Sequence, residues 1–136
     1  MWIHNCSKVH LILGKHPHPG DGGVLIQITD PEDEHALPKH SFDHVYRFAF
    51  HDLHCGLDER DWAKATPVSS QQAQHLVEIL QWTKQAQSNI VVQCPVGLAR
   101  SGAVVEVALL LGFEPTDAFR VPSLPLRYAM LEHLSL

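Results

Sequence analysis

The sequence has no long hydrophobic run, few cysteines and a low content of charged residues. None of its apolar stretches approaches the roughly 18 residues needed to cross a bilayer, so we expect no membrane-spanning segment. The first residues lack a basic stretch followed by a long apolar one, which predicts no signal peptide. The three cysteines form an odd number and suggest no disulfide framework. Together these absences predict a cytoplasmic protein in reducing surroundings.

Basic residues are also scarce. Ten Lys and Arg face fifteen Asp and Glu, for a formal charge of −5, and the basic residues are scattered along the chain. This pattern argues against a general polyanion-binding surface, so we expect neither nucleic acid nor membrane as a partner. The length of 136 residues fits one domain, residues 1–136, with a core large enough to be flanked by helices. The oligomeric state is left open.

The apolar pattern predicts strands that alternate with helices. We expect buried strands at residues 24–28, 45–50 and 89–93, and helices at 69–87, 102–111 and 128–134. The helix at 69–87 has the signature of a capping box, with Ser69 followed by Gln72. Residues 2–3 and 9–13 are expected to form an N-terminal hairpin or short edge strands. This order implies an α/β fold, with a central mixed, mostly parallel sheet of about four to five strands flanked by helices.

The most informative segment lies between the strand at 89–93 and the helix at 102–111. A loop in this position can direct its backbone N–H groups at one point near a helix N-terminus, which makes an anion site. Cys94 at its mouth would be stabilised as a thiolate, and Arg100 could return to the same centre and bind phosphate oxygens with its planar fork. The residues expected to form the cradle are Pro95, Val96, Gly97, Leu98, Ala99 and Arg100.

These residues match the pattern C-x-x-G-x-x-R-S, which resembles the phosphate loop of cysteine-based protein tyrosine phosphatases. The chain looks like a small member of their dual-specificity branch, and the resemblance covers about residues 24–134. It implies a phosphorylated protein as substrate, no cofactor, and Cys94 as a nucleophile that forms a cysteinyl-phosphate. Arg100 would hold the phosphate oxygens, and Ser101 would hydrogen-bond the sulfur. One departure is Gln93, where the family usually has His. Gln can still hydrogen-bond, so we expect an altered pKa of the thiol rather than loss of activity.

The resemblance also requires a general acid on a loop that follows an earlier strand. Asp52 is our choice, because it comes directly after the strand expected at 45–50. Asp58 and Asp61 lie on the same loop and are alternatives.

Other residues with metal-binding or redox-active side chains allow two further interpretations. His51, His54 and Cys55 lie close in sequence but lack the paired spacing of a structural zinc site, so no metal is expected. Cys6 or Cys55 could form a reversible disulfide with Cys94, although a free buried thiol is the simpler reading for both.

The leading functional hypothesis is hydrolysis of phosphotyrosine, and of phosphoserine or phosphothreonine, in proteins. An alternative keeps the chemistry but takes a phosphoinositide, a nucleotide or an RNA 5′-phosphate. The uncharged interior of the loop speaks against that substrate class. A module that binds phosphate without turnover is a second alternative, and a rhodanese-like sulfur transferase is a more distant third.

Overall fold

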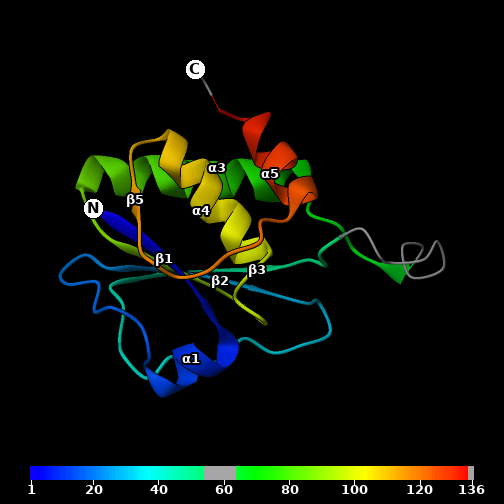
Figure 1. Ribbon diagram of the computed structural model, residues 1–136. Coiled ribbons are helices and arrows are strands. Elements are labelled where there is room, and N and C mark those ends of the chain that lie inside the picture. Colours follow the sequence, from blue (N-terminus) through cyan, green and yellow to red (C-terminus); the bar gives the residue numbers. More distant parts are fainter. Residues whose placement is uncertain (54–63, 135–136) are drawn as a thin grey trace.

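A computed structural model describes residues 1–53 and 64–134 of the chain. Within these residues a sheet of five parallel strands forms the centre of the molecule (Figure 1), in the order β3-β2-β4-β1-β5. The strands are β1 (Trp2–Ser7), β2 (Val24–Thr29), β3 (His44–Ala49), β4 (Ile90–Cys94) and β5 (Glu114–Pro115). The expected α/β sheet is confirmed, but the expectation of a mixed sheet is wrong because every strand pair is parallel.

Helices cover both faces of the sheet. In the described part of the chain these are α1 (Lys8–Leu13), α3 (Ser70–Ala86), α4 (Arg100–Leu110) and α5 (Leu124–Leu131). Figure 1 shows the short α1 on one side of the sheet and α3, α4 and α5 on the opposite side. The larger core cluster joins the sheet to α3, α4 and α5, and a smaller cluster around Leu11 and Leu25 lies on the α1 side. None of the helices in the described ranges is both long enough and apolar enough to cross a bilayer.

The N-terminal segment differs most from its sequence-based prediction. Instead of a hairpin or an edge strand, β1 pairs in parallel with β4 on one side and β5 on the other. The expected strand at 9–13 is helical, because Ser7 caps α1 by accepting the N–H of His10 at 3.1 Å. Val9 and Ile12 are exposed and Leu11 is buried, so the apolar run there reflects one buried helix position rather than a strand.

The remaining major elements follow their local sequence signals. The strands predicted at 24–28, 45–50 and 89–93 are present as β2, β3 and β4 with shifted ends. The predicted capping box is confirmed, since Ser69 accepts the N–H of Gln72 and the Gln72 side chain accepts the N–H of Ser69. The last helix begins at Leu124, earlier than expected.

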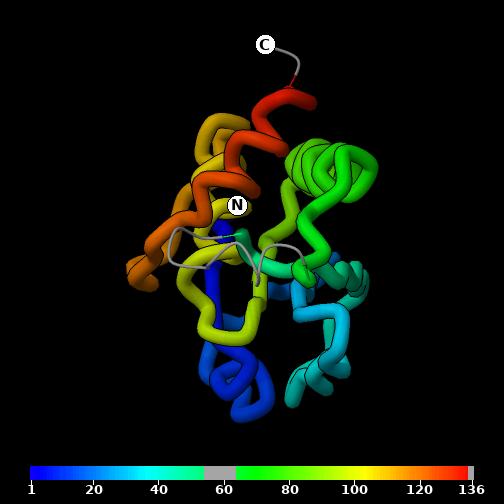
Figure 2. Tube along the Cα trace, turned by 90° about the vertical axis from the view of Figure 1, so that its right-hand side faces the viewer, coloured from blue at the N-terminus to red at the C-terminus, as the bar shows by residue number. Residues whose placement is uncertain are grey.

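Because all strands are parallel, their carboxyl ends lie at one edge of the sheet. Cys94 ends β4, Asp30 follows β2, and Asp52 comes soon after β3. In Figure 2 the yellow-green segment after β4 lies between the blue N-terminal segment and the orange segment that leads to α5. The topology therefore collects the chemistry-bearing residues from three strands.

The half-buried His4 gives the fold a testable pH dependence. Its Nδ1 atom lies 2.7 Å from Thr116 Oγ1, and burial together with nearby His16 lowers the pKa of His4 from 6.5 to about 4. The unfolded chain therefore takes up this proton first as pH falls, so His4 stabilises the fold above pH 6.5, and this contribution is lost between pH 6.5 and about 4.

We expect the pH dependence of the free energy of unfolding to flatten in His4→Gln. Urea denaturation at pH 7.5 and pH 4.5 should show the wild type losing about 1 to 2 kcal/mol more than the variant, a value discounted for the ring's partial exposure. Gln can still hydrogen-bond Thr116, so the comparison isolates the titration. Parallel pH profiles for the two proteins would contradict this assignment.

Candidate active site

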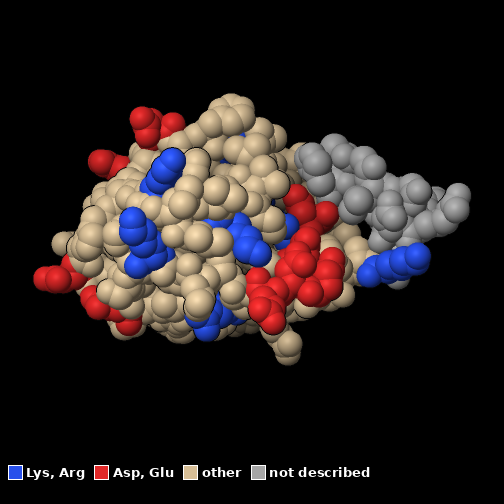
Figure 3. Space-filling view, turned by 90° about the horizontal axis from the view of Figure 1, so that it is seen from below, with Lys and Arg blue, Asp and Glu red and all other residues tan. Residues whose placement is uncertain are grey.

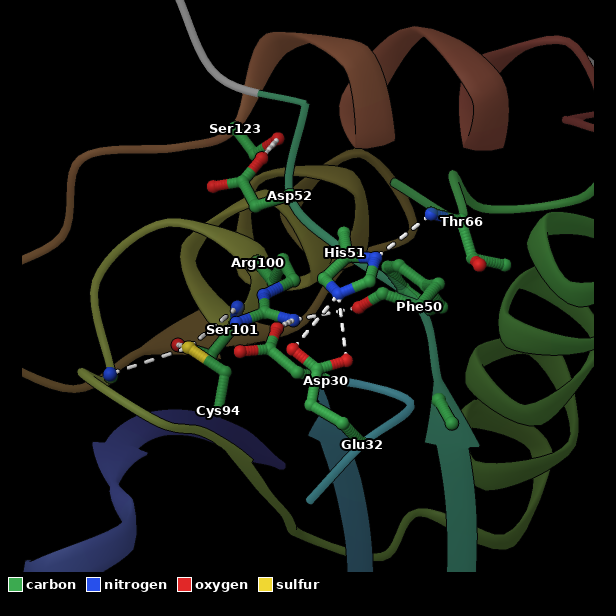
Figure 4. A network of polar contacts seen from close by, with 12 residues as sticks. Asp30, Glu32, Phe50, His51, Asp52, Thr66, Cys94, Arg100, Ser101 and Ser123 are labelled. Atoms are coloured by element: carbon green, nitrogen blue, oxygen red, sulfur yellow. Dashed lines mark hydrogen bonds and ion pairs between the residues drawn. The ribbon is translucent and has the colours of Figure 1, made fainter. Parts of the chain in front are cut away.

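The Cys94 loop, residues 94–101, wraps around the sulfur of Cys94. Cys94 Sγ accepts the backbone N–H groups of Gly97 at 3.3 Å and Ser101 at 3.5 Å, and it lies 3.2 Å from Ser101 Oγ (Figure 4). The residue is 2% exposed, at the base of the loop. A sulfur surrounded by N–H and O–H groups is in a position where negative charge is stabilised. The proximity of Ser101 to the sulfur is the one expected from the sequence.

Carbonyl groups of the loop are hydrogen-bonded by donors on its outer side. These donors come from β1, from the start of α1 and from residues 119–123, which lead into α5 and are called the 119–123 segment below. The bonds join Lys8 N to Pro95 O at 3.3 Å, Asn5 Nδ2 to Gly97 O at 2.9 Å, Val121 N to Leu98 O at 3.1 Å and Ser123 N to Ala99 O at 2.9 Å. With these acceptors engaged outside, the interior of the loop is left to its N–H groups, as an anion cradle requires.

Gly97 allows the loop to lie directly against β1. Its φ is +81°, and a Cβ atom at this position would overlap the backbone of Cys6 and Ser7. Both the left-handed conformation and the close approach require glycine here. The glycine of the sequence motif thus serves the packing of the loop on β1 as well as the turn.

Arg100 begins α4 and is almost completely buried. Its Nη1 atom donates to Asp30 Oδ1 at 2.8 Å and to the Phe50 carbonyl at 2.7 Å. These two bonds use both Nη1 hydrogens, and the described residues offer no acceptor to Nε or Nη2. The Nε–Nη2 edge is therefore the part of the fork that remains for a phosphate group.

A cavity of about 590 Å³ adjoins the Arg100 side of the loop. Its volume is in the range of small-ligand sites. The residues that line it are Asp30, Glu32, His51, Asp52, Lys64, Ala65 and Arg100. Figure 4 shows how the labelled side chains from the ends of β2, β3 and β4 gather here. The sequence pattern did not identify Asp30, Glu32 or Lys64.

The half-buried Asp52 lines this cavity together with Arg100. Its Oδ1 atom accepts a hydrogen bond of 2.6 Å from Ser123 Oγ. Asp52 is thus held near the predicted nucleophilic loop by a residue that is distant in sequence. The alternatives Asp58 and Asp61 lie outside the described residues.

His51 connects three segments at the cavity. Its Nδ1 accepts the N–H of Thr66 at 2.8 Å, and its Nε2 lies 2.9 Å from the Glu32 carboxylate. Because Nδ1 accepts, Nε2 carries the proton of the neutral ring and donates it to Glu32. This pairing gives His51 a structural role, which the interpretation of this residue as a metal ligand did not include. His54 and Cys55 lie outside the described residues, and within residues 1–53 and 64–134 no group of three ligating side chains is placed to hold a metal ion.

Gln93 and Cys6 lie on the opposite face of the sheet from Cys94. Gln93 Oε1 accepts from Gln27 Nε2 at 3.1 Å, and Gln27 in turn accepts from Arg47 and donates to the Ala36 carbonyl. Cys6 pairs in register with Gln93 rather than with Cys94 and is a free thiol. Burial, with a smaller effect of Cys94, raises the pKa of Cys6 to about 12, so this thiol stays protonated at neutral pH.

Charged residues on the α1 side follow the distribution expected from the sequence. Figure 3 shows lysines and arginines at several places on this face, together with one larger group of adjoining acidic side chains. The segment after β2 contributes Asp30, Glu32, Asp33 and Glu34, of which the last three are exposed. Phosphate binding at the Cys94 loop would therefore depend on local groups rather than on a basic surface.

Comparison with protein-family models and with curated proteins finds no match to this chain. Assignment of the site therefore depends on its geometry and on the residues of the loop.

The role of Gly97 can be tested by comparing Gly97→Ala with Gly20→Ala. Both glycines have a positive φ, +81° and +78°, but a Cβ at Gly20 would have no atom within 4 Å. We expect Gly20→Ala to cost about 1 kcal/mol of unfolding free energy from backbone strain alone. Gly97→Ala should cost about 3 kcal/mol or more, because overlap with β1 adds to the strain. Equal costs in urea denaturation would contradict the close packing of the loop on β1.

Proposed function

We propose that this protein is a cysteine-dependent phosphomonoester hydrolase of the dual-specificity phosphatase type, acting on phosphotyrosine and on phosphoserine or phosphothreonine in proteins. The observation that carries the proposal is the position of Cys94 Sγ. The sulfur accepts the N–H groups of Gly97 and Ser101 from its own loop, and Arg100 of the same loop lines a cavity together with the Asp52 side chain. This set supplies a nucleophile, an anion site and a proton donor.

In the first step the Cys94 thiolate attacks phosphorus, and an S–P bond forms as the P–O ester bond breaks. The loop N–H groups and the Nε–Nη2 edge of Arg100 hold the equatorial oxygens as charge moves between them. Asp52 gives its proton to the leaving oxygen, so that the substrate departs as a neutral alcohol or phenol.

In the second step water attacks the cysteinyl-phosphate on the side that the leaving group has vacated. Asp52, now a carboxylate, accepts a proton from this water, and the S–P bond breaks to release inorganic phosphate. Ser101 Oγ, 3.2 Å from the sulfur, donates a hydrogen bond to the thiolate as it leaves. Asp52 thus acts in opposite proton states in the two steps.

The charge of the cavity supports a phosphomonoester with no further phosphate groups. Asp30, Glu32 and Asp52 line it together with Arg100, and the loop residues Val96, Leu98 and Ala99 carry no charge. Additional phosphates of an inositol phosphate or an RNA 5′-triphosphate would face these three acidic side chains, against which Lys64 is the one further cation among the described residues that line the cavity. This arrangement favours a phosphorylated side chain over the non-protein alternatives.

The nucleophile is tested with Cys94→Ser, for which Cys6→Ala is the matched control. Hydrolysis of an aryl phosphate should be abolished in Cys94→Ser and largely kept in Cys6→Ala, because Cys6 lies on the other face of the sheet. Arg100→Lys keeps the charge but loses the planar fork, so its kcat should fall by about 100-fold or more. Vanadate should inhibit the wild type, and a chelator should leave it unchanged. Full activity in Cys94→Ser would overturn the mechanism.

The acid is tested by the pH dependence of kcat in Asp52→Asn. We expect kcat to fall by about 100- to 10,000-fold and the basic limb of the profile to disappear, because Asn cannot donate the proton. Asp30→Asn is the matched comparison, since it weakens the hold on Arg100 and should mainly raise KM while the basic limb persists. Asp58→Asn and Asp61→Asn should leave the limb in place. Loss of the limb in either of these instead would move the acid away from Asp52.

A further inference from the structure

Ser123 stands immediately before α5, where a serine would normally cap the helix with its side chain. The structure uses its hydroxyl differently. No side-chain capping bond is made at this end of α5, and Ser123 Oγ instead donates to Asp52 Oδ1 at 2.6 Å. The residue is 1% exposed, so water cannot replace this bond. Because this buried hydroxyl binds a carboxylate at the candidate site instead of capping α5, helix capping does not explain why a serine is present here.

The backbone of the same residue holds the Cys94 loop. Ser123 N donates to Ala99 O at 2.9 Å, and Ala99 is the N-cap of α4, next to Arg100. Ser123 therefore contacts the phosphate cradle through its main chain and the acid through its side chain. Among the described residues that bind the loop from outside, it alone also bonds to Asp52.

The 119–123 segment is itself fixed on α4. Gly102 lets it approach closely, since a Cβ there would come within 3.1 Å of Arg120 Cβ and 3.5 Å of Pro122 Cα. Arg120 also forms an ion pair with Glu106 on α4, with Nε and Oε1 2.9 Å apart. Ser123 is thus held in a fixed position relative to α4 and the Cys94 loop. Its hydrogen bond to Asp52 fixes the position of that carboxyl group as well.

We infer that Ser123 is a positioning residue for the acid, which sets Asp52 at a fixed place relative to the phosphate loop. This inference rests on the proposed phosphatase function. The Ser123 hydroxyl occupies Oδ1 of Asp52 as a hydrogen-bond donor, so the transferable proton is carried on Oδ2 (Figure 4). The hydrogen bond thereby selects which oxygen faces the leaving group.

The test compares Ser123→Ala with Ser123→Thr on two aryl phosphates. Phenyl phosphate has a poor leaving group that needs protonation, whereas p-nitrophenyl phosphate has a good one that needs little. Ser123→Ala should lower kcat for phenyl phosphate by about 10-fold and for p-nitrophenyl phosphate by about 2-fold or less, with KM unchanged. The basic limb should persist, because Asp52 still supplies the proton. Ser123→Thr keeps the hydroxyl and should restore the wild-type ratio between the two substrates.

A double-mutant cycle with Asp52→Asn separates positioning from general destabilisation. Adding Ser123→Ala to Asp52→Asn should change kcat for phenyl phosphate by less than about 2-fold, since there is no acid left to position. An equal loss on both substrates, a full further loss in the Asp52→Asn background, or wild-type kinetics in Ser123→Ala would each overturn the inference and leave the phosphatase proposal intact. A wild-type protein without Cys94-dependent turnover would overturn the proposed function, and this inference with it.

Discussion

The site depends on hydrogen bonds that the Cys94 loop makes outwards, to residues that would take no part in the reaction. Every residue of a short loop has a carbonyl group, and carbonyls that turned inwards would repel an anion. Here donors from β1, from the start of α1 and from the 119–123 segment engage the carbonyls of Pro95, Gly97, Leu98 and Ala99. If the proposed function holds, the loop is therefore organised before phosphate binds, and binding would not meet the cost of ordering it.

Arg100 is the second group whose position is set in advance. An arginine with a free side chain would lose considerable entropy on binding phosphate. Its Nη1 is instead fixed by Asp30 and by the Phe50 carbonyl, from the ends of two neighbouring strands. Asp30 also reduces the net charge of the cavity, so the site would hold phosphate by directed hydrogen bonds more than by excess positive charge. Under the proposed function such a site would also release inorganic phosphate, because directed bonds to a small anion are matched by its hydration in water.

The sequence allowed prediction of whatever depends on neighbouring residues. The strands β2, β3 and β4, the capping box of α3 and the strand–loop–helix context of Cys94 all have local signals. β1 was missed as an interior strand because its buried positions include Asn5, whose polarity suits the loop that it binds rather than a core. From the sequence alone, Ser123 is expected to cap a helix, and Asp30, which precedes a proline, is expected to be a solvated carboxylate. Their partners, Asp52 and Arg100, are distant in sequence, and no local pattern encodes such contacts.

The same distinction explains why a sequence motif can identify the nucleophile of such a site but not its acid. Nucleophile and anion cradle lie on the same side of phosphorus, so one loop and the start of one helix can supply both. In-line displacement places the leaving oxygen on the opposite side of phosphorus, where that loop cannot reach. The acid must then come from another strand end and be held there by a third element. Under the proposed function these are the end of β3 and the 119–123 segment, which meet at the bond between Asp52 and Ser123. The geometry of the reaction itself thus makes part of the site non-local in sequence.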